Sequence, residues 1–292
     1  MSPPPAGWSL RGRANFRSRA AAEVDAAGAR LEWLALAERI ESLGGTVVVL
    51  EPPDDALSGL PYAAEAGHPL PPLKPGGKPR FILPRMKPEH RRAEKNLWAR
   101  FAAELGFEVI ELGVGIWEGQ GDVAKFDGCT LLFWGGRTDR VGEQAARTHF
   151  PGEVIELEIR EPAFHGNMGV LPLDHADTLM VCADVLEDDA LAVLEARFGK
   201  DRMHLVSEEE IRLYATNGLP IGDTVLCPSI VPDRVRKVME RSGMRVDILP
   251  MPELCEKAGG ASRCLVAKFE NAPELTIPPG FTLPSVAKRI RG

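Results

Sequence analysis

One pattern occurs five times in this sequence and constrains its fold more than any other feature: an amphipathic helix, a glycine or short polar turn, and a brief apolar strand. Further apolar runs between these segments are typical of buried strands. The helix-to-strand segments are residues 36–50, 97–112, 143–157, 191–206 and 235–249, and the extra strands are expected at 80–83, 130–133, 178–182, 224–227 and 263–267. Each unit therefore holds at least two strands and one helix, and it recurs at intervals of about 40 to 60 residues.

A repeat of this length is typical of propeller-like or array folds. We expect an α/β chain whose five units form a ring, in which loops from every unit meet at a central axis. An ordinary open α/β sheet is the alternative, because helices that alternate with strands are common. The 292 residues, 44% of them hydrophobic, can bury a large core, and this length suits one large domain or two ordinary ones.

Composition restricts the partners. A formal net charge of -7 argues against nucleic acid or an anionic membrane surface, since both need a surplus of lysine and arginine, so a small-molecule partner is favoured. No apolar run approaches the roughly 18 residues that span a bilayer, and residues 1–7 lack the apolar core of a signal peptide, so we expect a cytoplasmic protein.

The sequence also carries no signature of a metal or cofactor site. It has no phosphate loop or dinucleotide-binding fingerprint, and its six histidines lack metal-ligand spacing, so we expect neither a metal nor a cofactor. The five cysteines have no paired zinc-type spacing and are expected to be free thiols.

Three short glycine-rich segments carry the candidate chemistry. Residues 118–122 supply Glu118 and Asp122, residues 164–167 supply His165, and residues 259–264 supply Cys264. A carboxylate, an imidazole and a thiol form the inventory for covalent cysteine chemistry. Taken singly, a buried cysteine or histidine is more often an ordinary core residue, and a glycine-flanked carboxylate is more often part of a polar turn. A ring of five units would bring the three segments together.

On these motifs the chain resembles the guanidino-group-modifying superfamily with the pentein fold, which includes arginine deiminases, dimethylarginine dimethylaminohydrolases and amidinotransferases. The resemblance runs from about residue 30 to 270 and rests on residues 118–122, 136–140, 164–165, 217 and 259–265. It implies a five-bladed α/β propeller that forms a single catalytic domain over residues 1–292. We expect residues 1–10 to be flexible and residues 285–292 to form a solvated basic tail. Members of the family are often dimers, so a homodimer is possible.

The resemblance further implies that Cys264 is the nucleophile, that His165 is the general acid and base, and that Glu118 holds the substrate's guanidinium. This agrees with the chemistry, because a guanidinium carbon is a poor electrophile that needs a thiolate and protonation of the departing amine. Two arginines, Arg91 and Arg137, match positions that hold a substrate carboxylate in the dimethylarginine hydrolases. We expect Glu65, Asp122 and Asn167 to join them as substrate-binding residues.

Three positions concern the negative charges that the family pattern predicts: two lack an expected carboxylate, and one could replace it. Gly59 stands where relatives have an aspartate, and Asn167 stands where deiminases and amidinotransferases have a carboxylate. Glu65 matches an acidic or amide position and could restore one charge. The loss of two anions favours an unusual guanidine or amidine substrate, or a site whose charge balance has moved to other residues.

Three functions remain open at the level of sequence. The first is a hydrolase that cleaves a carbon–nitrogen bond of an arginine-like guanidino or amidino compound through a covalent S-amidino-cysteine intermediate. The second is an amidinotransferase that passes the same intermediate to an amine. The third is a non-catalytic pentein-fold binding protein, which Gly59 and Asn167 make conceivable. Cys264, His165 and Glu118 favour the enzymes.

Overall fold

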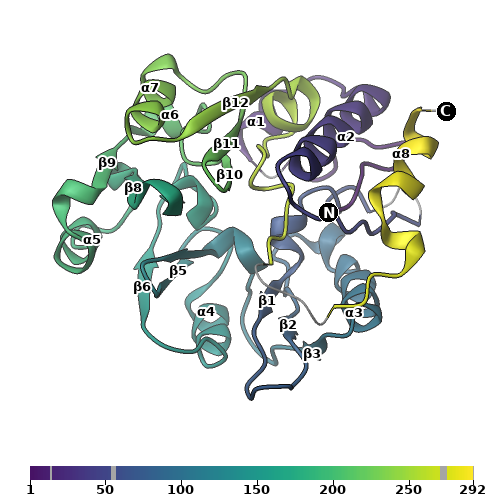
Figure 1. The fold of residues 1–292 in the computed structure, drawn as a ribbon, viewed down its shortest axis with the longest axis horizontal. Coiled ribbons are helices and arrows are strands. Elements are labelled where there is room, and N and C mark those ends of the chain that lie inside the picture. Colours follow the sequence, from purple (N-terminus) through teal and green to yellow (C-terminus); the bar gives the residue numbers. More distant parts are fainter. Residues whose placement is uncertain (14, 54–56, 270–274, 292) are drawn as a thin grey trace.

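The computed structural model describes residues 1–13, 15–53, 57–269 and 275–291 (Figure 1). Four three-stranded sheets in these ranges share one topology: the first strand is antiparallel to the second, and the second is parallel to the third. Their strands are β1 (His68–Leu70), β2 (Arg80–Ile82) and β3 (Glu108–Ile110); β4 (Val123–Phe126), β5 (Cys129–Trp134) and β6 (Val154–Glu158); β7 (Val170–Leu173), β8 (Thr178–Val181) and β9 (Met203–Leu205); and β10 (Leu219–Ile221), β11 (Thr224–Pro228) and β12 (Arg245–Leu249).

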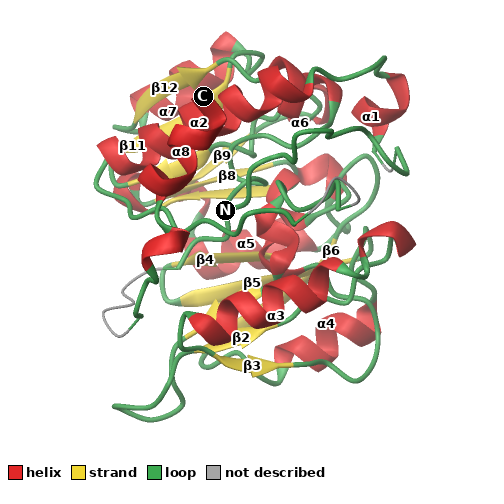
Figure 2. Ribbon diagram, turned by 90° about the vertical axis from the view of Figure 1, so that its right-hand side faces the viewer, coloured by secondary structure: helices red, strands yellow, loops and turns green. Residues whose placement is uncertain are grey.

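A helix connects the second and third strands of every sheet, as a parallel pair requires, since parallel strands need a long crossover. The four crossover helices are α3 (Glu94–Glu104), α4 (Arg140–Arg147), α5 (Ala190–Phe198) and α7 (Asp233–Arg241). Figure 2 shows these helices packed along the sheets. The remaining helices are α1 (Phe16–Ala20), α2 (Ala26–Ser42), α6 (Glu208–Ile211) and α8 (Leu283–Arg291). The repeated unit of two strands, a helix and a third strand is thus present four times.

The expected fifth blade differs from the other four. Helix α2 leads into residues 46–50 as predicted, but Val48 forms only an isolated antiparallel bridge to Thr282, and no strand ladder is assigned there among the described residues. The strand expected at 263–267 is a turn instead, in which the Cys264 amide donates to the carbonyl of Ala261 at 2.9 Å. The α/β repeat is therefore present, whereas the closed five-bladed propeller is not confirmed.

The middle strands of the sheets form the centre of the core. In β5 the side chains of Leu131, Leu132 and Phe133 are fully buried, which is typical of a strand covered on both faces. Burial of each such side chain contributes about 2 kcal/mol to stability. All five cysteines are free and buried. Among the helices of the described ranges, none is long and apolar enough to cross a membrane.

Both ends of the chain differ from expectation. Residues 1–10 were expected to be flexible, but Ser2 and Trp8 are buried, and the Trp8 indole donates to the carbonyl of Ser58 at 2.8 Å. The expected solvated tail at 285–292 instead belongs to α8, up to Arg291, and residue 292 lies outside the described residues. The apolar residues of α8 recur at helical spacing, and they pack against α2, as the buried Val286 does. The basic residues of the segment concealed this apolar pattern in the sequence.

Candidate active site

Three of the candidate site residues occupy equivalent places in the repeat, because they lie on the turns that lead into the first strands of three sheets. Glu65 lies in the 3-10 turn Ala63–Ala66 before β1, and Glu118 begins the turn Gly119–Asp122 before β4. His165 begins the turn Gly166–Met168 before β7. The four first strands surround one central cavity, so the turns that precede them converge at one end of it. Segments separated by about a hundred residues thereby meet.

The Glu118–His165 pair forms the centre of the site. His165 Nε2 lies 2.8 Å from Glu118 Oε2, and neither side chain is exposed. The second carboxylate oxygen of Glu118 accepts the Lys87 amide at 2.9 Å, and Arg137 Nη1 lies 3.3 Å from Oε2. Burial alone would raise the pKa of Glu118, but the hydrogen bond and charge of His165, with the charges of Arg137 and Arg91, outweigh it and hold this pKa well below its usual range. Glu118 is therefore an anion that can stabilise an imidazolium.

Asp122 holds the histidine turn in place. Its Oδ1 accepts the Gly166 amide at 2.7 Å, and its Oδ2 accepts the Thr138 hydroxyl at 2.6 Å. Burial raises the pKa of Asp122 to about 6, against the opposing effects of His165, Thr138 and Gly166. The sequence places Asp122 among the substrate-binding residues, but both of its oxygens bond within the protein, which indicates a positioning role.

Cys264 lies beside two asparagines. Its Sγ accepts from Asn167 Nδ2 at 3.5 Å, and only 2% of the residue is exposed. Burial raises the pKa of the Cys264 thiol, although hydrogen bonds from Asn217 and Asn167 and the charge of Arg263 lower it in part. An amide can donate to a sulfur and a carboxylate cannot, so Asn167 at this position favours the thiolate in a way that an aspartate would not.

Arg91 was expected to bind a substrate carboxylate, but its guanidinium is engaged inside the protein. It forms ion pairs with Glu65 and Glu94, and its Nη2 donates to the carbonyl of Gly59 at 2.9 Å. The arginine is only 6% exposed. A Cβ at Gly59 would overlap the Arg91 guanidinium, so Arg91 fills the space that a side chain at residue 59 would need. The cation is thereby neutralised before any ligand arrives.

Glu94 is a site residue that the sequence motifs did not reveal. It is 1% exposed and pairs with both Nε and Nη2 of Arg91, at 3.0 and 2.8 Å. Its only sequence signal is the spacing of three residues from Arg91 across the start of α3. Glu65 lies on the other side of the guanidinium, and its Oε1 is 3.5 Å from His165 Nδ1. Two buried carboxylates therefore flank the Arg91 guanidinium.

Arg137, the second expected carboxylate-binding residue, is better placed for that role. Its guanidinium pairs with Glu118 and lies 5.3 Å from the centre of the Phe164 ring. Its side chain is 12% exposed and lines the cavity above the site.

Three buried groups of the site could supply ligands to a cation. One ligand atom each from Glu65, Glu118 and His165 lies within 4.8 Å of the others. Arg91 already pairs with Glu65, however, and Arg137 with Glu118, so carboxylate oxygens that would coordinate a metal ion already have guanidinium partners. The arrangement suits a proton-transfer site better than a metal centre.

A segment near the N-terminus covers the site. The cavity beside it has a volume of about 70 Å³. Its roof comes from what we call the N-terminal strap, residues 8–13 and 15–18. Trp8 and Asn15 fasten the strap, the latter through a 2.9 Å bond from Nδ2 to the carbonyl of Ala258. The strap therefore forms part of the wall of this cavity.

Comparisons with known proteins agree with the motifs. No protein-family model matches the chain. It is 25% identical over 262 residues to the uncharacterized protein ZK1307.1 of Caenorhabditis elegans, which covers 84% of this chain and 85% of the relative. It is 27% identical over 225 residues to the N(G),N(G)-dimethylarginine dimethylaminohydrolase of Mycobacterium tuberculosis, covering 75% of this chain and 64% of that enzyme's length.

Solved structures show the same fold. The N-terminal domain of ArgZ, an arginine dihydrolase of the ornithine–ammonia cycle in Cyanobacteria, superimposes with a TM-score of 0.81 at 22% identity, covering 91% of this chain and 94% of that domain. AgrE bound to L-arginine gives a TM-score of 0.82 at 20% identity, but this chain spans only 41% of it. A dimethylarginine dimethylaminohydrolase gives 0.65 at 20% identity, with 85% and 93% coverage.

The protein is thus an α/β protein whose four mixed sheets match the fold of these pentein-fold neighbours. Its resemblance to the guanidino-group-modifying superfamily is confirmed by these neighbours.

Proposed function

We propose that this protein is a hydrolase that cleaves a carbon–nitrogen bond of a guanidino or amidino compound through a covalent intermediate on Cys264. The observation that carries the proposal is the convergence of Cys264, the Glu118–His165 pair and a set of buried carboxylates on one covered site. The similarity to an arginine dihydrolase and a dimethylarginine hydrolase supports the same class of substrate.

The charge balance of the site favours a cation. Four buried carboxylates, those of Glu65, Glu94, Glu118 and Asp122, lie among the cations of Arg91 and Arg137. The carboxylates exceed the arginines by two, so the site has an excess of negative charge. The planar guanidinium of a substrate can balance part of this charge and donate hydrogen bonds to a carboxylate. Since Arg91 is already paired with two carboxylates, we propose that Arg137 meets a substrate carboxylate where the substrate has one.

The first chemical step forms the intermediate. A bound cation lowers the raised pKa of the Cys264 thiol, whose proton passes to His165. The thiolate then attacks the guanidinium carbon and forms a carbon–sulfur bond. As the carbon–nitrogen bond breaks, the imidazolium gives its proton to the departing nitrogen, which leaves as ammonia or an amine. Glu118, 2.8 Å from the imidazole, stabilises the imidazolium between the two transfers.

The second step releases the product. The neutral imidazole of His165 takes a proton from a water molecule, whose oxygen attacks the amidino carbon. The carbon–sulfur bond breaks, the product leaves with a carbonyl in place of the lost amine, and the proton returns to the thiolate of Cys264. An amine that enters instead of water would complete an amidino transfer.

We also propose a reducing, cytoplasmic location for the protein, which its five free, buried cysteines support.

A product screen tests the proposal. The purified chain is incubated with guanidino compounds that carry a carboxylate and with others that lack one, and ammonia, amines and ureido products are measured. Turnover should disappear in Cys264→Ala and persist in Cys129→Ala, which removes another buried thiol. Stimulation by added amines would identify transfer in place of hydrolysis. Turnover that survives in Cys264→Ala, or no turnover and no labelling of Cys264 by an electrophilic amidine, would contradict the proposal.

A further inference from the structure

Gln120 is a residue of the Glu118–Asp122 motif that has no part in the steps proposed above. It lies in the turn Gly119–Asp122 and is half-buried. Its side chain lines the central cavity, and among the described residues it is absent from the lining of the cavity beside the catalytic groups. Gln120 is therefore placed to act on the site through other residues and not by contact with a substrate.

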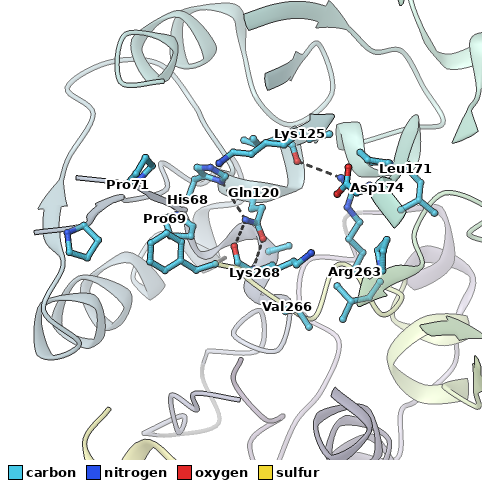
Figure 3. A pocket seen from close by; sticks show the side chains of 18 of the residues that line it. His68, Pro69, Pro71, Gln120, Lys125, Leu171, Asp174, Arg263, Val266 and Lys268 are labelled. Atoms are coloured by element: carbon cyan, nitrogen blue, oxygen red, sulfur yellow. Dashed lines mark hydrogen bonds between the residues drawn. The ribbon is translucent and has the colours of Figure 1, made fainter. Parts of the chain in front are cut away.

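The Gln120 side chain is bonded to the main chain of the segment that carries Cys264. Its Nε2 donates to the carbonyl of Lys268 at 2.7 Å, and its Oε1 accepts the Lys268 amide at 2.6 Å (Figure 3). A carboxamide offers the same donor and acceptor as a peptide group, so it can pair with both main-chain groups of one residue. Gln120 therefore forms a two-point contact with a residue four positions after Cys264.

The segment that Gln120 contacts is not part of a sheet. In the described ranges no strand is assigned to residues 263–269, and Cys264 lies in a turn. A strand within a sheet is fixed by a regular ladder of main-chain hydrogen bonds. Here the two bonds from Gln120 take the place of such a ladder, together with the bond from the Ala64 amide to the Cys264 carbonyl at 3.0 Å.

The main chain of Gln120 contacts another segment of the site. Its amide donates to the carbonyl of Gly67 at 3.0 Å, directly after the turn that carries Glu65. The two turns lie so close together that a Cβ at Gly119 would be 2.6 Å from the Gly67 nitrogen. Gln120 thus joins the turn of Glu65 through its main chain and the segment of Cys264 through its side chain.

We propose that Gln120 is a positioning residue that holds the thiol of Cys264 in line with the carboxylate of Glu118. This role rests on the proposed hydrolase function, because it concerns the alignment of the groups in that reaction. A displacement of about 1 Å between reacting groups can reduce a rate about a hundredfold. Loss of both side-chain bonds should therefore reduce reactions that need this alignment much more than reactions that need only the thiol.

A pair of alkylating reagents tests the proposal. The cation 2-chloroacetamidine and the neutral 2-chloroacetamide share a leaving group and differ in charge, so the ratio of their rates with Cys264 measures the alignment of the carboxylates with the thiol. The parent chain should favour the cation more than a small free thiol does. In Gln120→Met, which removes both bonds without a change of charge, this ratio should fall at least about tenfold. The rate with 2-chloroacetamide should not fall, because the thiol is still present.

Two further variants complete the experiment. Gln144→Met changes the same residue type at an exposed position of α4 and should keep the parent ratio. Gln120→Asn keeps the carboxamide on a shorter side chain that cannot span both bonds, so it should also lower the ratio, and it provides the same test if Gln120→Met does not fold. Urea unfolding identifies the folded variants, and mass spectrometry locates the alkylated cysteine. With a substrate from the product screen, Gln120→Met should lower kcat at least about tenfold and change KM less than about threefold.

Two results would overturn the role of Gln120 alone: a parent ratio that Gln120→Met keeps, or rates with both reagents that fall by the same factor, which indicates a merely structural role. A parent chain that favours the cation no more than a free thiol does would contradict the proposed function as well, and with it the alignment that Gln120 is proposed to hold.

Discussion

The buried arginine of the active site provides a quantitative test of the structure. Arg91 is 6% exposed and pairs with Glu94, Glu65 and a main-chain carbonyl. Removal of one partner from a buried ion pair costs about 3–5 kcal/mol. Glu94→Gln keeps an oxygen for one hydrogen bond, and Glu65 remains in place, so we expect the lower end of this range, a loss of about 3 kcal/mol in the free energy of unfolding.

Urea unfolding, followed by tryptophan fluorescence, measures the change, and the buried Trp98 lies one turn from Glu94 in the same helix. The matched control is Glu111→Gln, because Glu111 is 62% exposed and its pair with Lys95 lies at the surface. We expect that control to cost no more than about 0.5 kcal/mol. A loss below about 1 kcal/mol in Glu94→Gln, or equal losses in the two variants, would refute the claim that Arg91 is neutralised inside the protein.

Three further predictions concern the same region. Gly59→Ala places a Cβ against the neighbouring guanidinium and should destabilise the fold by about 1–3 kcal/mol, whereas Gly280→Ala, with open space around it, should be nearly neutral in urea unfolding. Alkylation of Cys264 should rise with pH with a midpoint above the ordinary thiol pKa of about 8.5, because burial disfavours the thiolate; a plateau already at neutral pH would contradict this. Asn15→Ala removes the bond to the Ala258 carbonyl and the bond from the Ser18 amide, so it loosens the N-terminal strap. It should speed that alkylation at least about fivefold, the equivalent of about 1 kcal/mol, while the exposed Asn96→Ala leaves it unchanged.

The fold was predictable where the pattern was local. Four helix-to-strand units are visible in the sequence because each crossover helix and the strand after it have their own hydrophobic period and an intervening turn. The fifth could not be judged in the same way, since the pairing of Val48 depends on Thr282, far along the chain. The C-terminal helix was missed because its charge concealed a buried stripe of three apolar residues per two turns.

The same division applies to the site. The glycine-rich motifs predicted that Glu118, His165 and Cys264 belong together. In the structure Glu118 bonds His165, and Cys264 contacts Asn167, two residues after His165. The environment of Arg91 could not be predicted, because a charge is neutralised by whichever groups the fold brings near it. The N-terminal strap had no signal either, since its roofing role depends on contacts with residues more than forty positions away, such as Ser58.

The spread of the site along the chain has a consequence for biosynthesis. Glu65 is made early and Cys264 late, so during translation the carboxylates and the imidazole precede the residue that we propose as the nucleophile. Domains fold as units while the chain emerges N-terminus first. An incomplete chain therefore lacks the thiol altogether, and the final segment, once folded, delivers the thiol directly into a site whose other groups are in place. Covalent reactivity would thus arise together with the completed fold, which spares the unfinished protein from reaction with stray electrophiles at this cysteine.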